Sequence, residues 1–143
     1  MANPKILVDQ RLLRGFRRRA LKAYPLEHME AIHGKVDDLT LKIYSIHPFD
    51  QESATKDSVT VKGEHIDQDI EDAQDAGLIV LGDIHTHPGL PGEGAAPSEA
   101  DYRDAHHHGS LLLGICHIHK NKARMSTRIR FYLANKPLKL KIR

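Results

Sequence analysis

An apolar run that continues into histidines is the feature of this sequence that most constrains its fold. Residues 78–81 read LIVL, and residues 82–87 follow without a break as GDIHTH. A short, continuous apolar run is typical of a central strand that is covered on both faces. Such strands end at the edge of the sheet where open α/β folds place their ligands. The sequence therefore predicts a central strand over residues 78–87 whose end borders a functional site.

The segments around this strand alternate between helical and strand patterns. The pattern predicts a helix over residues 10–23, which Asp9 caps and Tyr24-Pro25 ends. Strands are expected over residues 29–36, 38–48, 58–62, 110–120, 126–135 and 137–142, helices over 64–76 and 98–108, and a loop over 48–57. This order predicts a single domain over residues 1–143, of layered α/β or α+β class, with a mixed central sheet flanked by helices.

The acidic segment at 64–76 is expected to pack through an apolar stripe. Ile66, Ile70 and Ala73 are spaced i, i+4, i+7, which places them on one face of a helix. Gly77 stands where a helix C-cap is expected. The sequence therefore predicts that this face turns toward the core.

Composition limits the compartment and the partners that we expect. The chain has one cysteine, Cys116, which fits a reducing compartment such as the cytoplasm. Residues 1–10 lack an apolar signal segment, and LIVL and LLL are too short to span a bilayer, so no membrane partner is expected. Basic residues crowd the first helix, at Arg11, Arg14, Arg17, Arg18, Arg19 and Lys22. Such a run is usually a solvated helix face, with a nucleic-acid surface as the alternative.

The histidines at the end of the central strand have the spacing of metal ligands. Side chains two residues apart in a strand point the same way, so His85 and His87 project from one face, and Asp83 lies on that face too. By itself, an H-x-H pair is more often a surface feature than a ligand pair. The assignment of a metal site therefore depends on a third ligand.

Ser98 and Asp101 offer that ligand, although they also have a purely structural interpretation. A serine N-cap with an acid three residues later resembles a capping box. In the same geometry, Asp101 lies in the first helical turn, from which its carboxylate can reach a metal held by His85 and His87. Two imidazoles and one carboxylate leave a fourth tetrahedral position for water, which is typical of catalytic Zn²⁺. These residues therefore allow two interpretations, a helix cap alone or a cap that also supplies a ligand to catalytic Zn²⁺.

A hydrolytic zinc site also needs a base, and Glu27 and Glu30 both stand in the stretch YPLEHMEAIHG. The run HTHP, a glycine- and proline-rich loop, PSEAD and an upstream glutamate together resemble the signature of the JAMM (MPN+, JAB) zinc metalloproteases. In that family the glutamate commonly stands in a P-x-E-x-x-G-x-x-x-G stretch. Pro25 and Gly34 align with that pattern, and the resemblance thereby selects Glu27.

The resemblance runs from the first helix to the serine helix and implies a JAB/MPN fold with a cytidine-deaminase-like architecture. It implies that His85, His87 and Asp101 hold Zn²⁺. It further implies that Glu27 is the general base that activates water and passes the proton to the leaving amine. The hydroxyl of Ser98 would donate a hydrogen bond to the developing oxyanion.

The chain departs from the family pattern at two places. Ten residues, 88–97, separate His87 from Ser98, where the family usually has seven. Glu30 replaces the glycine that usually follows the catalytic glutamate. Both departures bear on substrate preference, because the longer loop is expected beside the substrate cleft.

Other features suggest competing sites. The pair His117 and His119 and the run His106–His108 are expected to be ordinary strand and helix-end histidines, because Lys120, Lys122 and Arg124 disfavour a cation beside the pair. A zinc deaminase would need a P-C-x-x-C thiolate pair, and a serine hydrolase would need G-x-S-x-G; the sequence has neither.

The sequence thus predicts a JAMM-type zinc metalloprotease, a deubiquitinase-like isopeptidase that cleaves an amide or isopeptide bond. The family resemblance implies a protein or peptide substrate, such as the C-terminal tail of a ubiquitin-like or sulfur-carrier-like protein. Two alternatives remain open: a non-catalytic MPN-type module that binds a partner, and a nucleic-acid-associated protein that uses the basic first helix. The sequence predicts no oligomeric state.

Overall fold

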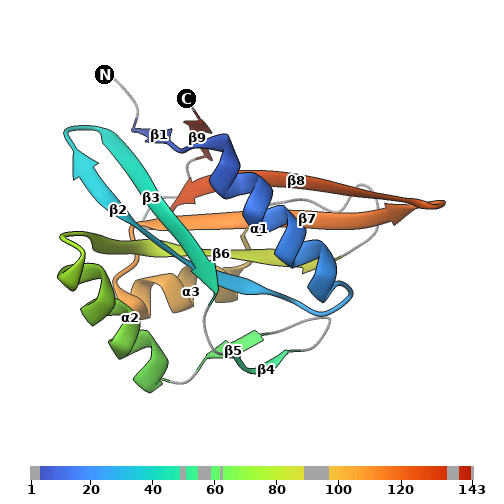
Figure 1. The fold of residues 1–143 in the computed structure, drawn as a ribbon, viewed down its shortest axis with the longest axis horizontal. Helices are drawn as coiled ribbons and strands as arrows, with labels where there is room; N and C mark the ends of the chain where they lie inside the picture. The colour runs from blue at the N-terminus through green and yellow to red at the C-terminus, as the bar shows by residue number, and fades with distance from the viewer. Residues whose placement is uncertain are drawn as a thin grey trace.

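The fold is a mixed sheet that curls into a closed barrel, with helices on both of its faces (Figure 1). The computed structural model describes residues 4–48, 51–54, 59–61, 63–88, 97–134 and 139–142. The barrel contains β1 (Lys5–Leu7), β2 (Met29–Asp37), β3 (Thr40–Pro48), β6 (Ile79–Pro88), β7 (Leu112–Asn121), β8 (Arg124–Leu133) and β9 (Lys139–Ile142). A separate pair is formed by β4 (Gln51–Ala54) and β5 (Val59–Val61), and the helices are α1 (Gln10–Ala23), α2 (Gly63–Asp75) and α3 (Glu99–His108).

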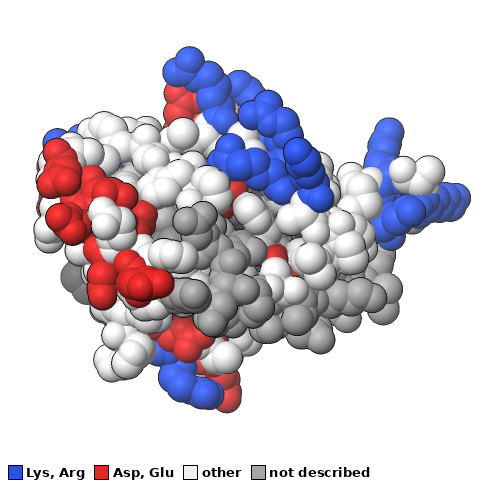
Figure 2. All heavy atoms as spheres, turned by 60° about the horizontal axis from the view of Figure 1, so that its bottom comes forward, with Lys and Arg blue, Asp and Glu red and all other residues white. Residues whose placement is uncertain are grey.

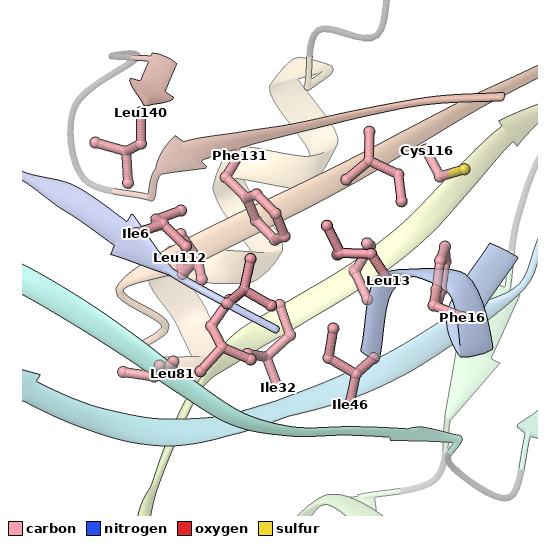
Figure 3. Close-up of a cluster of buried hydrophobic side chains, with 14 of the residues drawn as sticks. Ile6, Leu13, Phe16, Ile32, Ile46, Leu81, Leu112, Cys116, Phe131 and Leu140 are labelled. Carbon is pink, nitrogen blue, oxygen red and sulfur yellow. The ribbon is translucent and has the colours of Figure 1, made fainter. Parts of the chain in front are cut away.

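Helix α1 lies on the inner face of the curled sheet and completes the main core. The Asp9 side chain caps it by accepting a hydrogen bond from the Arg11 N–H at 2.8 Å. Of the apolar side chains that the sequence places on one face of this helix, Leu13, Phe16 and Ala20 are buried, whereas Leu21 is 37% exposed. Figure 3 shows Leu13 and Phe16 among apolar side chains that project from the strands.

Strand β6 occupies the middle of the sheet, as expected for an apolar run. It pairs antiparallel with β2 on one side and parallel with β7 on the other. Met29 at the start of β2 lies opposite His85 near the end of β6. Residues that precede β2 are therefore brought to the end of β6, although more than fifty positions separate them in the sequence.

Helices α2 and α3 cover the opposite face of the sheet from α1. Ala105 and Tyr102 of α3 pack in a second apolar cluster with Leu113 and Ile115 of β7. Helix α2 contacts β6 and buries Ala73. The sheet is thus flanked by helices on both faces, which confirms the expected layered fold.

Three details differ from the expectations. Residues 5–7 form β1, which the sequence pattern does not indicate, and residues 51–54 form β4 inside the segment expected to be loop. Helix α2 buries Asp69 rather than Ile70, which is 40% exposed, so its inward face is rotated from the predicted apolar stripe. Within the described ranges, no helix is long and apolar enough to cross a membrane.

Candidate metal centre

The end of β6 presents two histidines on the face that lies opposite α1. Ile84 and Thr86 are fully buried, and the alternation of the strand turns His85 and His87 the other way. The two imidazole rings lie 5.1 Å apart between centroids. Nδ1 of His85 lies 2.9 Å from Oδ1 of Asp83, and this contact orients the ring so that Nε2 points away from Asp83.

Asp101 reaches both histidines from the first turn of α3. Its Oδ1 lies 3.0 Å from Nε2 of His85, and its Oδ2 lies 3.2 Å from Nε2 of His87. The same carboxylate accepts a hydrogen bond from the Ser98 N–H at 2.8 Å, while the Ser98 hydroxyl oxygen accepts one from the Asp101 N–H at 3.1 Å. This is a complete capping box. The cap therefore holds Asp101 beside the histidines, and the structural and metal-binding interpretations are compatible.

Glu27 lies at the same place because backbone contacts join the start of β2 to the end of β6. The His28 N–H donates to the Thr86 hydroxyl at 2.8 Å, and the Thr86 N–H donates to the His28 carbonyl at 2.9 Å. Glu27 is 7% exposed, and it offers a carboxylate oxygen within 4.8 Å of ligand nitrogens of both His85 and His87. Three segments of the chain thus converge on one point.

Glu30 has a different environment, although it is only three residues from Glu27. It is fully buried on the α1 side, where Arg19 donates two hydrogen bonds of 2.8 Å to its carboxylate. Nε2 of His28 lies 2.6 Å from the same carboxylate. Of the two glutamates that the sequence offers as a base, the structure places Glu27 beside the histidines and Glu30 in an ion pair.

The charged groups of this centre shift one another's pKa values. Burial lowers the pKa of His85, but the carboxylates of Asp101 and Asp83 outweigh that effect and raise the pKa to about 10. Burial would raise the pKa of Asp101, but His85 and His87 hold it well below its usual range. The centre therefore favours positive charge among its carboxylates, and a divalent cation satisfies the same preference.

The donor set fits Zn²⁺. Imidazole nitrogens and carboxylate oxygens are its common protein ligands, and carboxylates that orient ligating histidines are typical of such sites. The buried Nε2 of His85 forms no hydrogen bond of good geometry, although Asp101 Oδ1 is only 3.0 Å away. Close approach without hydrogen-bond alignment is the arrangement of two ligands that point at a shared third atom.

The centre opens into a cleft of about 880 Å³ between the sheet, α2 and α3. Ser98, Glu27 and Asp101 line one part of it, while apolar side chains line another, at Val59, Val61, Ile66, Ile70 and Leu113. The exposed Ile70 of α2 therefore faces this cleft. The longer loop is expected here, but residues 89–96 lie outside the described ranges.

His117 also lines the cleft, which the sequence interpretation missed. Strands β6 and β7 pair in parallel with His87 opposite His117, so the two side chains project from the same face. Only the pairing of β6 with β7 reveals this neighbour, and the sequence does not specify that pairing. Within the described ranges, the groups of three or more metal-ligating side chains are Glu27/His85/His87 and His33/His47/Asp69, and neither His106–His108 nor His119 belongs to one.

Comparisons with known proteins agree with this fold. The family model for prokaryotic homologs of the JAB domain matches residues 9–132. The solution structure of protein DSY2949 from Desulfitobacterium hafniense superposes with a TM-score of 0.70 at 18% identity, and the match covers 96% of this chain and 91% of that chain. A comparison with curated protein sequences finds no match. The chain belongs to the family of prokaryotic homologs of the JAB domain.

Proposed function

We propose that the protein is a JAMM-type zinc hydrolase that cleaves an amide or isopeptide bond. The observation that carries this proposal is the convergence of Glu27, His85, His87 and Asp101 at one end of a cleft, with Ser98 on its wall. A structural zinc site is normally closed by four protein ligands. This site instead combines three ligands, a spare carboxylate and room for a substrate.

The proposed ligands of Zn²⁺ are His85, His87 and Asp101. When bound there, the ion would supply Lewis acidity toward a carbonyl group and toward water. Asp83 would keep the His85 ring in the orientation that leaves Nε2 toward the ion, since it already holds Nδ1 at 2.9 Å. The capping box would do the same for the Asp101 carboxylate.

Glu27 is the proposed general base. Its carboxylate lies within 4.8 Å of the ligand nitrogens, so it can take a proton from a water molecule that attacks at this point and later deliver the proton to the leaving amine. Ser98 is the proposed oxyanion donor. Its oxygen already accepts the Asp101 N–H, which leaves the hydroxyl proton available for a developing negative charge in the cleft.

The proposed substrate is the C-terminal tail of a ubiquitin-like or sulfur-carrier-like protein. A cleft of about 880 Å³ has room for several residues of an extended tail, and its apolar lining would contact their side chains. The single cysteine, Cys116, is buried, and its burial raises the pKa of the thiol to about 12. An unpaired thiol fits our proposal of a cytoplasmic location.

The test is cleavage of a ubiquitin-like protein that carries a C-terminal extension. Glu27→Gln should lower kcat by about 10²- to 10⁴-fold, because it removes the base but keeps the side-chain shape. Glu71→Gln, on the exposed surface of α2, is the matched control and should cleave at the wild-type rate. Wild-type cleavage by folded Glu27→Gln would refute the assignment of the base. Absence of cleavage with every tail-bearing substrate would favour a non-catalytic module that binds a partner.

A second candidate function rests on the charge of α1. Figure 2 shows Lys and Arg side chains gathered in patches that are separate from the acidic group over α2. Arg14 and Arg18 are exposed on α1, whereas Arg19 is committed to Glu30. If this surface binds nucleic acid, binding should weaken with salt and be lost in Arg14→Ala/Arg18→Ala. Equal binding by the variant and the wild type would exclude α1 as that surface.

A further inference from the structure

A second cluster of metal-ligating side chains lies on the same side of the sheet as the cleft. It contains His33 of β2, His47 of β3 and Asp69 of α2. Nε2 of His33 lies 2.9 Å from one Asp69 oxygen, and Nε2 of His47 lies 2.8 Å from the other. The two rings meet edge to face, with centroids 4.3 Å apart. The three ligand atoms all lie within 4.8 Å of one another.

The cluster is held together by groups that orient its ligands. The Ser45 hydroxyl contacts Nδ1 of His47 at 3.0 Å, so Nε2 of that ring is the nitrogen turned toward Asp69. Asp69 is buried, and its two carboxylate oxygens face Nε2 of His33 and Nε2 of His47. A carboxylate and two imidazoles form a three-ligand set for a borderline metal.

The position of Asp69 in α2 has no explanation in the packing of apolar residues. The helix offers Ile70 at the adjacent position, yet it buries Asp69 to 7% exposure and leaves Ile70 at 40%. Burying a carboxylate costs free energy unless it is paired or coordinates a metal. The contacts of the Asp69 carboxylate with the two histidines therefore orient the helix together with the buried Ala73, one turn further along.

We propose that His33, His47 and Asp69 form a second Zn²⁺ site, separate from the centre at the end of β6. Ligand atoms on a tetrahedral zinc lie about 3.3 Å apart at bond lengths of about 2.0 Å. The nitrogen–oxygen distances of 2.8 and 2.9 Å need only a small outward movement to reach that spacing. The side chain of His47 is 36% exposed, which gives the ion an entry path and a place for water as fourth ligand.

The site joins the β2–β3 hairpin to α2, which follows it in the chain after β4 and β5. Strands β2 and β3 contribute the histidines, and α2 contributes the carboxylate. Asp69, Ile66 and Ile70 of α2 also line the cleft. An ion at this site would fix α2, and with it one wall of the cleft, against the sheet. The proposal of this second zinc site does not depend on the proposed catalysis.

The test counts zinc in the full chain, purified without an affinity tag and dialysed against Zn²⁺. The wild type should hold two ions and His85→Ala/His87→Ala should hold one. Adding Asp69→Asn to that double variant should remove the remaining ion, whereas adding Asp67→Asn should not, because Asp67 is an exposed carboxylate on the same helix. Zn²⁺ should also raise the Tm of the double variant, whereas the Tm of the triple variant that carries Asp69→Asn should be the same with and without Zn²⁺.

His47→Gln provides a second route if Asp69→Asn fails to fold, since His47 is half-exposed, and it too should lose the ion. The proposal is overturned if His85→Ala/His87→Ala holds no zinc, or if its ion survives in folded Asp69→Asn. If the wild type holds only one zinc ion, the two variants show which of the two proposed sites binds it. Loss of that ion in His85→Ala/His87→Ala would refute only the second site, and loss in Asp69→Asn would refute only the centre proposed for catalysis.

Discussion

At the scale of single residues, environment separates side chains of identical chemistry. Glu27 and Glu30 are both buried, yet Glu27 faces the cleft and its histidines, while Glu30 faces Arg19 of α1. Alternate side chains of β2 point to opposite faces of the sheet, and this turns Glu30 toward α1. Glu27 precedes the strand, and the His28–Thr86 contacts hold it beside the end of β6. Glu30 occupies the position where the family pattern has glycine. The chain thus carries an ion pair between α1 and the sheet at that position.

Glu30→Gln should destabilise the fold by about 3 kcal/mol at neutral pH, because it leaves Arg19 without its charged partner. Burial raises the pKa of Glu30, but His28 and Arg19 outweigh it and lower the pKa from its usual value of 4.5. A carboxylate with a lowered pKa stabilises the fold while ionised, and this contribution is lost as pH falls through the folded-state pKa. Urea unfolding measures the free energy of unfolding of the wild type and of Glu30→Gln. The difference between the two proteins should be constant from pH 5 to 7 and should narrow below pH 4.5. A difference independent of pH would contradict the charged pair.

Asp83→Asn should weaken Zn²⁺ binding at the β6 centre by about 10- to 100-fold, because the amide no longer holds His85 through a charged contact. Asp83 does not belong to the proposed ligand set, so the fold and the ligand count should remain. Isothermal titration with Zn²⁺ measures the change, and Asp67→Asn, at an exposed position of α2 that does not line the cleft, is the control. Equal affinity in wild type and Asp83→Asn would show that the capping box alone orients the site.

At the scale of elements, the sequence predicts what local signals encode. Helix α1 shows its cap and apolar face, the β2–β3 hairpin shows its turn, and β6 shows its continuous apolar run. Strand β1 has only three residues, so it gives no periodic signal and exists through pairing with β3 and β9. The rotation of α2 is likewise invisible in its own segment, because the histidines that contact Asp69 come from other strands.

The candidate centre divides in the same way. The local spacing of His85, His87 and Asp101 predicts a group of metal ligands, whereas the family resemblance selects Glu27 and implies a role for Ser98. His117 has no such signal, because it approaches His87 only through the parallel pairing of β6 and β7. Local spacing therefore predicts ligands within one element, while neighbours across strands depend on topology.

Gly82→Ala should destabilise the fold by about 3 kcal/mol or more, since a Cβ at this position would overlap the Leu112 carbonyl where β7 pairs with β6. Gly77→Ala is the control: its φ of +75° disfavours alanine, but the space around it is open, so the cost should be about 1 kcal/mol. Urea unfolding measures the free energy of unfolding of both variants. Equal destabilisation by the two substitutions would show that β6 and β7 do not approach as closely as the structure places them at Gly82.

At the scale of the whole molecule, the curled sheet carries the site. Its residues come from the segment just before β2, the end of β6 and the first turn of α3, which the pairing of β2 with β6 and the packing of α3 against β7 bring together. The sheet itself closes into a barrel. Strand β1 closes that barrel by pairing in parallel with both β3 and β9. Closure places the fully buried Ile6 among the core residues of Figure 3.

Ile6→Ala should therefore destabilise the molecule by about 3 kcal/mol, because it leaves a cavity where β1 meets the core. Leu7→Ala, at a position that is 47% exposed in the same strand, should change the free energy of unfolding by at most about 0.5 kcal/mol. Amide exchange adds a spatial test, since protection in β9 should fall in Ile6→Ala and remain in Leu7→Ala. If both variants matched the wild type, β1 would be dispensable, and the sheet would hold its shape as an open, curled layer.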